Sequence, residues 1–164
     1  MQTFLPYSDF EKTVKCLDWR RLGKQRVESR QILNIILGAS PNSRWRNHPA
    51  VLMWQGYAPV LSQYSDLCIK EWIARGYKNN MLILGIHGDF AKPIWLGDEE
   101  FHAAHRSNLL RKNSEYYSQF NWTEPNNLEY IWPVRRRRKD SKFLIHKCFV
   151  QKYNLPTESN SVEI

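Results

Sequence analysis

The sequence lacks the features that would place the protein across or outside a membrane. No apolar run approaches the roughly 20 residues that a transmembrane helix needs. The N-terminus, Met-Gln-Thr-Phe-Leu-Pro-Tyr, has no basic region followed by a long apolar stretch, so it does not match a secretory signal. We therefore expect a cytoplasmic protein, associated with the nucleoid, or a nuclear one if the host is eukaryotic.

Cysteine is scarce and widely spaced. The three cysteines, Cys16, Cys68 and Cys148, form no close pair, which indicates free thiols in a reducing compartment. Their spacing does not match a zinc site. The histidines at 102, 105 and 146 fit ordinary surface or hydrogen-bonding roles better than ligand roles.

Positive charge is in excess. The formal net charge of +8 and the pI of about 9.5 favour nucleic acid or an anionic membrane as partner. Without membrane features, nucleic acid is the better interpretation. Between Asp18 and Asp66 the only acidic residue is Glu28, and many cations stand around it: Arg20, Arg21, Lys24, Arg26, Arg30, Arg44 and Arg46. An enzyme that holds a polyanion and moves a proton on it needs such a carboxylate among cations.

The hydrophobic pattern predicts a mainly helical chain. We expect a compact single-domain bundle of about four main helices with irregular connections over residues 1–133, and a basic, partly disordered C-terminal extension over 134–164 that includes the run Arg135 to Lys139. The expected helices span residues 9–16, 18–37, 49–76 with a kink at Pro59, and 98–112. Residues 78–97 fit either a strand or a buried loop.

Helix geometry gives Glu28 its neighbours. At about 100° per residue, Leu22 and Leu33 lie on one apolar stripe, and Glu28 lies about 100° away from it. Arg21, Lys24, Gln25 and Gln31 share the face of Glu28, whereas Arg26 and Arg30 point to the other side. On this pattern alone, Glu28 could also be a surface acid paired with Lys24.

Three segments together resemble a known family. They are the helix around Arg-Leu-Gly-Lys-Gln-Arg-Val-Glu, the segment from His48-Pro49-Ala50 to Arg75-Gly76-Tyr77, and the segment from Phe101-His102-Ala103-Ala104-His105-Arg106 to Tyr116-Tyr117. In this order, over about residues 1–122, the chain resembles the pyrimidine-dimer DNA glycosylase family of the phage ultraviolet-repair endonuclease V. It is most similar to a bacterial branch that opens Met-(Gln/Asn)-Thr-Phe-Leu-Pro.

The resemblance implies a mechanism. In this family an N-terminal α-amine, here that of Met1, or of Gln2 if Met1 is removed, attacks the anomeric carbon and forms a Schiff base, and a helix glutamate, here Glu28, assists the β-elimination that cuts the strand. An α-amine with a pKa near ~8 is partly neutral at neutral pH. The resemblance also implies a compact all-α domain without metal or cofactor. It further implies a monomer bound to double-stranded DNA with a damaged or modified base. The candidates for DNA contact are Arg21, Lys24, Gln25, Arg26, Arg30 and Arg106.

Some positions differ from the phage pattern. Where the phage enzyme has Thr after the initiator Met, this chain has Gln2, a bulky residue that normally prevents removal of Met1. A phage His one turn before the glutamate corresponds to Arg21. Two alternatives therefore stay open: a nucleic-acid-binding module without catalysis, and a glycosylase that acts on another modified base or on RNA. We expect His48 to begin a helix rather than to act as a base.

Overall fold

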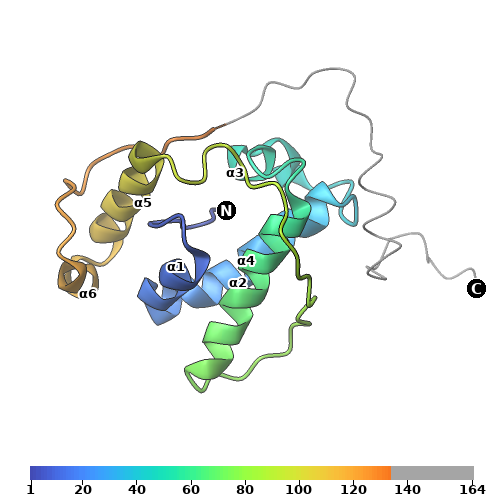
Figure 1. Ribbon diagram of the computed structural model, residues 1–164, viewed down its shortest axis with the longest axis horizontal. Helices are drawn as coiled ribbons and strands as arrows, with labels where there is room; N and C mark the ends of the chain where they lie inside the picture. Colours follow the sequence, from blue (N-terminus) through green and yellow to red (C-terminus); the bar gives the residue numbers. More distant parts are fainter. Residues whose placement is uncertain (134–164) are drawn as a thin grey trace, which may run out of the picture.

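Helices make up all the regular structure in the part of the chain that the structure describes, residues 1–133 of a computed structural model (Figure 1). The elements in order are α1 (Phe10–Cys16), α2 (Trp19–Ile36), the 3-10 helix η1 (Arg44–Asn47), α3 (Pro49–Leu52), α4 (Ala58–Ala74), α5 (Glu99–Lys112), α6 (Ser114–Tyr117) and the 3-10 helix η2 (Ser118–Phe120). The all-α prediction is confirmed, and residues 78–97 form no strand. The extension over 134–164 and its basic run lie outside the described residues.

Short-range capping explains where the helices begin. The Asp18 side chain accepts hydrogen bonds from the backbone N–H groups of Arg20 and Arg21, at 2.9 and 3.0 Å, and so caps α2. Asp18 is also held from outside its helix, because its Oδ2 accepts a hydrogen bond of 2.8 Å from the Tyr117 hydroxyl. Gly38, just past the end of α2, has a φ of +80°, the left-handed conformation that glycine adopts without strain.

The prediction of a single kinked helix over residues 49–76 is wrong. The structure has two helices here, α3 and α4, separated by residues 53–57. Gly56 in this break has a φ of +86°, which no α-helix accommodates. Pro59 lies in the first turn of α4, where its missing N–H leaves no hydrogen bond unmade. The proline therefore helps to begin a helix instead of bending one.

The core forms where α2 and α4 pack together, with α1 against α4 (Figure 1). Its fully buried side chains include Leu22, Ile32 and Leu33 of α2 and Leu61 and Tyr64 of α4. The N-terminal segment runs between this helix pair and α5 (Figure 1). This placement brings the first residues of the chain against the middle of α2.

The connection from α4 to α5 is irregular but held to both core helices. Asp66 of α4 accepts hydrogen bonds from the backbone N–H groups of Leu84 and Gly85, at 2.9 and 2.8 Å. On α2, Arg26 donates to Asn79 Oδ1 at 2.7 Å, and Arg30 donates to the Leu82 carbonyl oxygen at 2.6 Å. Among the described residues, no helix is long and apolar enough to cross a membrane.

Candidate active site at the N-terminus

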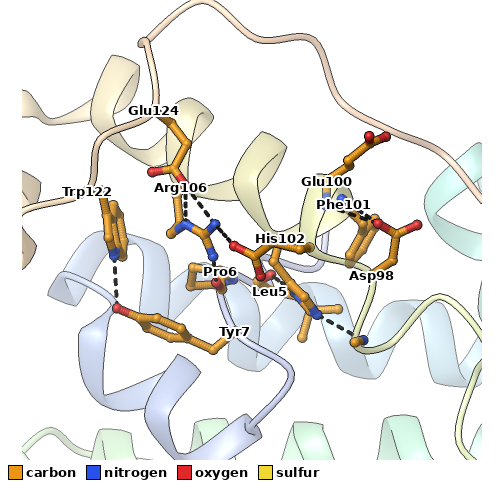
Figure 2. Close-up of polar contacts among 12 residues, drawn as sticks. Leu5, Pro6, Tyr7, Asp98, Glu100, Phe101, His102, Arg106, Trp122 and Glu124 are labelled. Carbon is orange, nitrogen blue, oxygen red and sulfur yellow. Dashed lines mark hydrogen bonds and ion pairs between the residues drawn. The ribbon is translucent and has the colours of Figure 1, made fainter.

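The N-terminal segment is anchored to α5 on one side (Figure 2). His102 donates from Nδ1 to the Leu5 carbonyl oxygen at 2.7 Å, and its Nε2 accepts the Gly97 N–H at 3.0 Å. Both bonds exist together only in the neutral ring with its proton on Nδ1. Burial accordingly lowers the pKa of His102 below its ordinary value, although the hydrogen bond to Leu5 acts in the opposite direction.

Arg106 is the second anchor on α5. Its guanidinium donates to the Pro6 carbonyl oxygen at 2.9 Å and to Glu124 at 2.7 Å, and it also pairs with Glu99 (Figure 2). Burial disfavours the charged guanidinium, but the bonds to Glu124 and Glu99 outweigh burial and raise the pKa of Arg106. Arg106 therefore joins three segments: the N-terminus, α5 and the residues after η2.

Gln25 of α2 anchors the segment on its other side. Its Oε1 accepts the Phe4 N–H at 2.8 Å, and its Nε2 donates to the Gln2 carbonyl oxygen at 2.8 Å. The Tyr64 hydroxyl lies 2.8 Å from Gln25 Oε1 and 2.9 Å from the Phe4 carbonyl oxygen, and it donates to one of them at a time. Gln25 is fully buried, so it serves the backbone of residues 2–4 and not the solvent.

Glu28 meets the chain at residue 2. One carboxylate oxygen, Oε2, accepts the backbone N–H of Gln2 at 3.2 Å and lies 3.5 Å from Gln25 Nε2. Glu28 is half-buried, and the structure shows no ion pair between it and Lys24. The carboxylate thus faces the start of the chain, one helical turn beyond the glutamine that positions it.

Cations from two helices gather beside this carboxylate. Arg21 pairs with Asp18 at 3.4 Å and donates to the Lys112 carbonyl oxygen at 3.1 Å, which joins the start of α2 to the end of α5. Burial, followed by the charges of Arg21, Arg111 and Lys24, lowers the pKa of Lys112, and Glu28 partly offsets this effect. We call Arg21, Lys24, Arg111 and Lys112 the cation cluster. Sequence reasoning missed the two α5 residues, because as the basic end of a helix they fitted the helix dipole.

His48 caps α3 and contributes a titratable ring near the site. Its Nδ1 accepts the Ala50 N–H at 3.1 Å, so the predicted role at a helix start is confirmed. Burial and the charge of the N-terminal ammonium at Met1 lower the pKa of His48, while Glu28 acts to raise it. His48 is therefore neutral at pH 7 and lies within electrostatic range of both Met1 and Glu28.

Comparison with known proteins bears on the residues that meet at the start of the chain. The family model described as pyrimidine dimer DNA glycosylase matches residues 1–84, just over half of the 164 residues. The chain belongs to that family. Its match covers α1 to α4 and includes Gln2, Gln25 and Glu28, the three residues that meet at the start of the chain. No curated protein and no solved structure matches the chain. The family implies a DNA glycosylase with DNA as its partner.

The structure places the predicted site residues of this glycosylase-family protein in three groups. The first group lies at the start of the chain, where Gln25 and Glu28 meet residues 1 and 2. Beside it, the cation cluster contributes Arg21 and Lys24. Arg26 and Arg30 lie on another face of α2 and hold residues 79–82. Arg106 is 7 % exposed and bound to carboxylates. DNA contact by any of these residues stays a prediction. Within residues 1–133, no three or more His, Cys, Asp or Glu side chains come together as ligands for a metal ion.

Proposed function

We propose that the protein is a DNA glycosylase with abasic-site lyase activity that acts on damaged or modified pyrimidines such as pyrimidine dimers. One observation carries the proposal: the nitrogen of Gln2 lies 3.2 Å from the Glu28 carboxylate. If Met1 is removed, this nitrogen becomes the α-amine. A carboxylate within hydrogen-bond distance of it then fits an amine-based lyase, with the amine as nucleophile and Glu28 as its acid–base partner.

The reaction that fits this pair has two stages. A neutral α-amine attacks C1′ of the damaged nucleotide, the glycosidic bond breaks, and the base leaves with one amine proton. The C1′–O4′ bond then opens, O4′ takes up a proton from solvent, and a protonated Schiff base joins the enzyme to C1′. Glu28 then accepts a proton from C2′, the C3′–O bond breaks with the phosphate as leaving group, and water hydrolyses the Schiff base. The strand is cut and the amine is regenerated.

The amine belongs to Met1 or to Gln2. Glu28 accepts a hydrogen bond from the nitrogen of Gln2, and Gln25 donates one to its carbonyl oxygen. These bonds favour the nitrogen of residue 2 as the nucleophile once Met1 is removed. If Met1 is retained, its own α-amine is the nucleophile. The charges of this amine and of Glu28 both act on the pKa of His48, so all three groups lie near one another.

The cation cluster supports phosphate binding near the reacting sugar. Lys24 is exposed, and Arg21 keeps part of its guanidinium accessible beside Asp18. We assign phosphate contacts first to Arg21 and Lys24. Arg26, Arg30 and Arg106 are already bonded to protein partners, so contact with DNA would require them to exchange those bonds.

Borohydride trapping tests the chemistry. The protein is incubated with duplexes that contain a pyrimidine dimer, an abasic site or no lesion, and borohydride then reduces any Schiff base to a stable adduct. We expect an adduct at the N-terminal residue with a damaged duplex, and peptide mapping with intact mass identifies whether Met1 or Gln2 carries it. No adduct on any lesion would overturn the lyase proposal and leave a DNA-binding protein.

The Glu28→Gln variant tests the proton acceptor. We expect it to lose strand cutting while it retains salt-sensitive DNA binding, because an amide cannot accept the C2′ proton. Glu11→Gln is the matched control, since Glu11 is an exposed helix glutamate that pairs with Lys15. If Glu28→Gln cuts at the normal rate, Glu28 does not have the role proposed here.

A further inference from the structure

An exposed tryptophan stands next to the site on a short, ordered turn. Trp45 in η1 is 48 % exposed, although tryptophan usually buries most of its surface. The turn is held by its own hydrogen bonds: the Trp45 N–H donates to Ser43 Oγ at 3.2 Å, and the His48 N–H donates to the Trp45 carbonyl oxygen at 2.8 Å. The ring is thus presented to solvent by a defined backbone.

Contacts place this ring beside the reacting groups. Trp45 meets the edge of His48 with ring centroids 5.2 Å apart, and His48 meets Trp132 at 5.7 Å. His48 lies within electrostatic range of Met1 and Glu28. In addition, η1 packs against both α2 and α3. Trp45 therefore borders the site through His48 and the packing of η1 on α2.

The charges on this turn match a polyanion. Arg44 and Arg46 flank Trp45, both are exposed, and neither guanidinium bonds to another residue in the described part of the chain. An aromatic ring between two unpaired cations is the arrangement that nucleic-acid surfaces use to stack on bases and bind the adjoining phosphates.

Geometry requires a nucleotide to leave the DNA duplex here. Gln2 is 8 % exposed, and Met1 and Glu28 are half-buried, so a sugar inside an intact duplex cannot bring its C1′ to the amine at the start of the chain. We propose that Trp45 stacks into the gap that the extruded nucleotide leaves, while Arg44 and Arg46 bind the phosphates on either side. This inference rests on the proposed function, because Trp45 would hold the duplex in the conformation in which the extruded nucleotide reaches the amine.

Other exposed apolar side chains fit this role less well. Leu82 and Ile94 are 71 % and 83 % exposed, but they are aliphatic and offer no ring to stack. Trp19 is 53 % exposed, with the Arg20 guanidinium 5.1 Å from its ring. Trp19 precedes Glu28 by nine residues of α2, which places it about 13 Å along the axis and on the opposite side of the helix. Trp19 is therefore a matched control.

Equilibrium binding tests the inference without any chemistry. Two duplexes of one sequence are compared: an undamaged duplex, and one that carries a tetrahydrofuran residue, which leaves a gap in the stack and cannot form a Schiff base. We expect Trp45→Ala to lose about tenfold or more in affinity for the tetrahydrofuran duplex. Its affinity for the undamaged duplex should stay within about twofold. Trp45→Phe should keep most of the preference, and Trp19→Ala all of it.

The cations give a second readout. Arg44→Gln and Arg46→Gln should weaken binding to both duplexes equally and lower the slope of log affinity against log salt by about one each. The inference is overturned if Trp45→Ala retains the preference for the gap, if it weakens both duplexes equally, or if the unmodified protein has no preference.

The two proposals fail separately. If borohydride traps no adduct but the gap preference depends on Trp45, the chemistry is wrong and the stacking residue stands. If an adduct forms and Trp45→Ala behaves as the unmodified protein, the stacking residue is wrong and the chemistry stands.

Discussion

Gln25 is the residue through which stability and activity should be coupled most directly. It is fully buried, and its amide serves the Phe4 N–H and the Gln2 carbonyl oxygen at 2.8 Å each. Neither backbone group has another hydrogen-bond partner within residues 1–133. Gln25→Leu keeps the size of the side chain and removes both of its polar atoms.

The magnitude follows from the groups left behind. Two buried backbone groups lose their partner at about 1–3 kcal/mol each, while the Tyr64 hydroxyl can still donate to the Phe4 carbonyl oxygen. The leucine side chain returns about 1–2 kcal/mol through its apolar surface. With each range taken at its middle, we expect Gln25→Leu to lower the free energy of unfolding by about 2–3 kcal/mol.

Urea unfolding and borohydride trapping together check this expectation. Trapping should slow by about tenfold or more where the variant is fully folded, because the nitrogen of residue 2 is no longer held against Glu28. Gln31→Leu, at an exposed position of the same helix, should change stability by less than about 0.5 kcal/mol and trap normally. A loss below about 1 kcal/mol would refute the accounting of hydrogen bonds. Normal trapping by a destabilised Gln25→Leu would show that Gln25 does not position the nucleophile.

Three further outcomes follow from buried polar groups. His105 is fully buried, and burial, with a smaller contribution from the charge of His102, lowers its pKa to about 3. Below pH about 6.5 the unfolded chain binds a proton that the folded protein does not, so up to about 4 kcal/mol of stability is lost as the pH falls toward 3. Urea unfolding between pH 7 and 4 should show this loss, and His105→Leu should reduce it; an unchanged pH slope in the variant would contradict it. Arg106→Met strands the carboxylate of Glu124 and should cost about 3 kcal/mol in urea unfolding. If stability instead holds and the salt slope of DNA binding falls by about one, Arg106 binds a phosphate. Asp66→Ala removes the acceptor of two N–H groups, so hydrogen exchange at Leu84 and Gly85 should accelerate with trapping unchanged; protected amides there would contradict it.

Local signals predicted the helices whose ends are set by neighbouring residues. Asp9, Asp18 and Asp98 each cap a helix within three residues of themselves, so sequence alone suffices to find α1, α2 and α5. The break between α3 and α4 escaped the same reasoning. Apolar residues keep a helical period through residues 53–57, and only the backbone conformation at Gly56 shows that the chain leaves the helix there.

The assignment of side chains to roles divides in a similar way. The sequence singled out Glu28 by its isolation among cations and put Gln25 on its face of the helix, both consequences of the repeat of a single helix. The same repeat separated Arg26 and Arg30 from Glu28, and the structure shows them bonded to residues 79–82. The helical repeat could not show that carboxylates surround Arg106, because Glu124 follows 18 residues later in an irregular segment.

By itself the sequence determined the helical class, the position of Glu28 on its helix and the membership of a DNA glycosylase family. Only the tertiary structure decided that Glu28 contacts residue 2, that Lys112 of α5 lies within electrostatic range of Glu28, and that the rings of His48 and Trp45 meet. The reason is physical. Helix caps and periods depend on residues within a few positions of one another, whereas Glu28 and Gln2 are 26 positions apart, and Arg106 and Pro6 are 100 apart. Contacts over such separations exist only once the helices have packed.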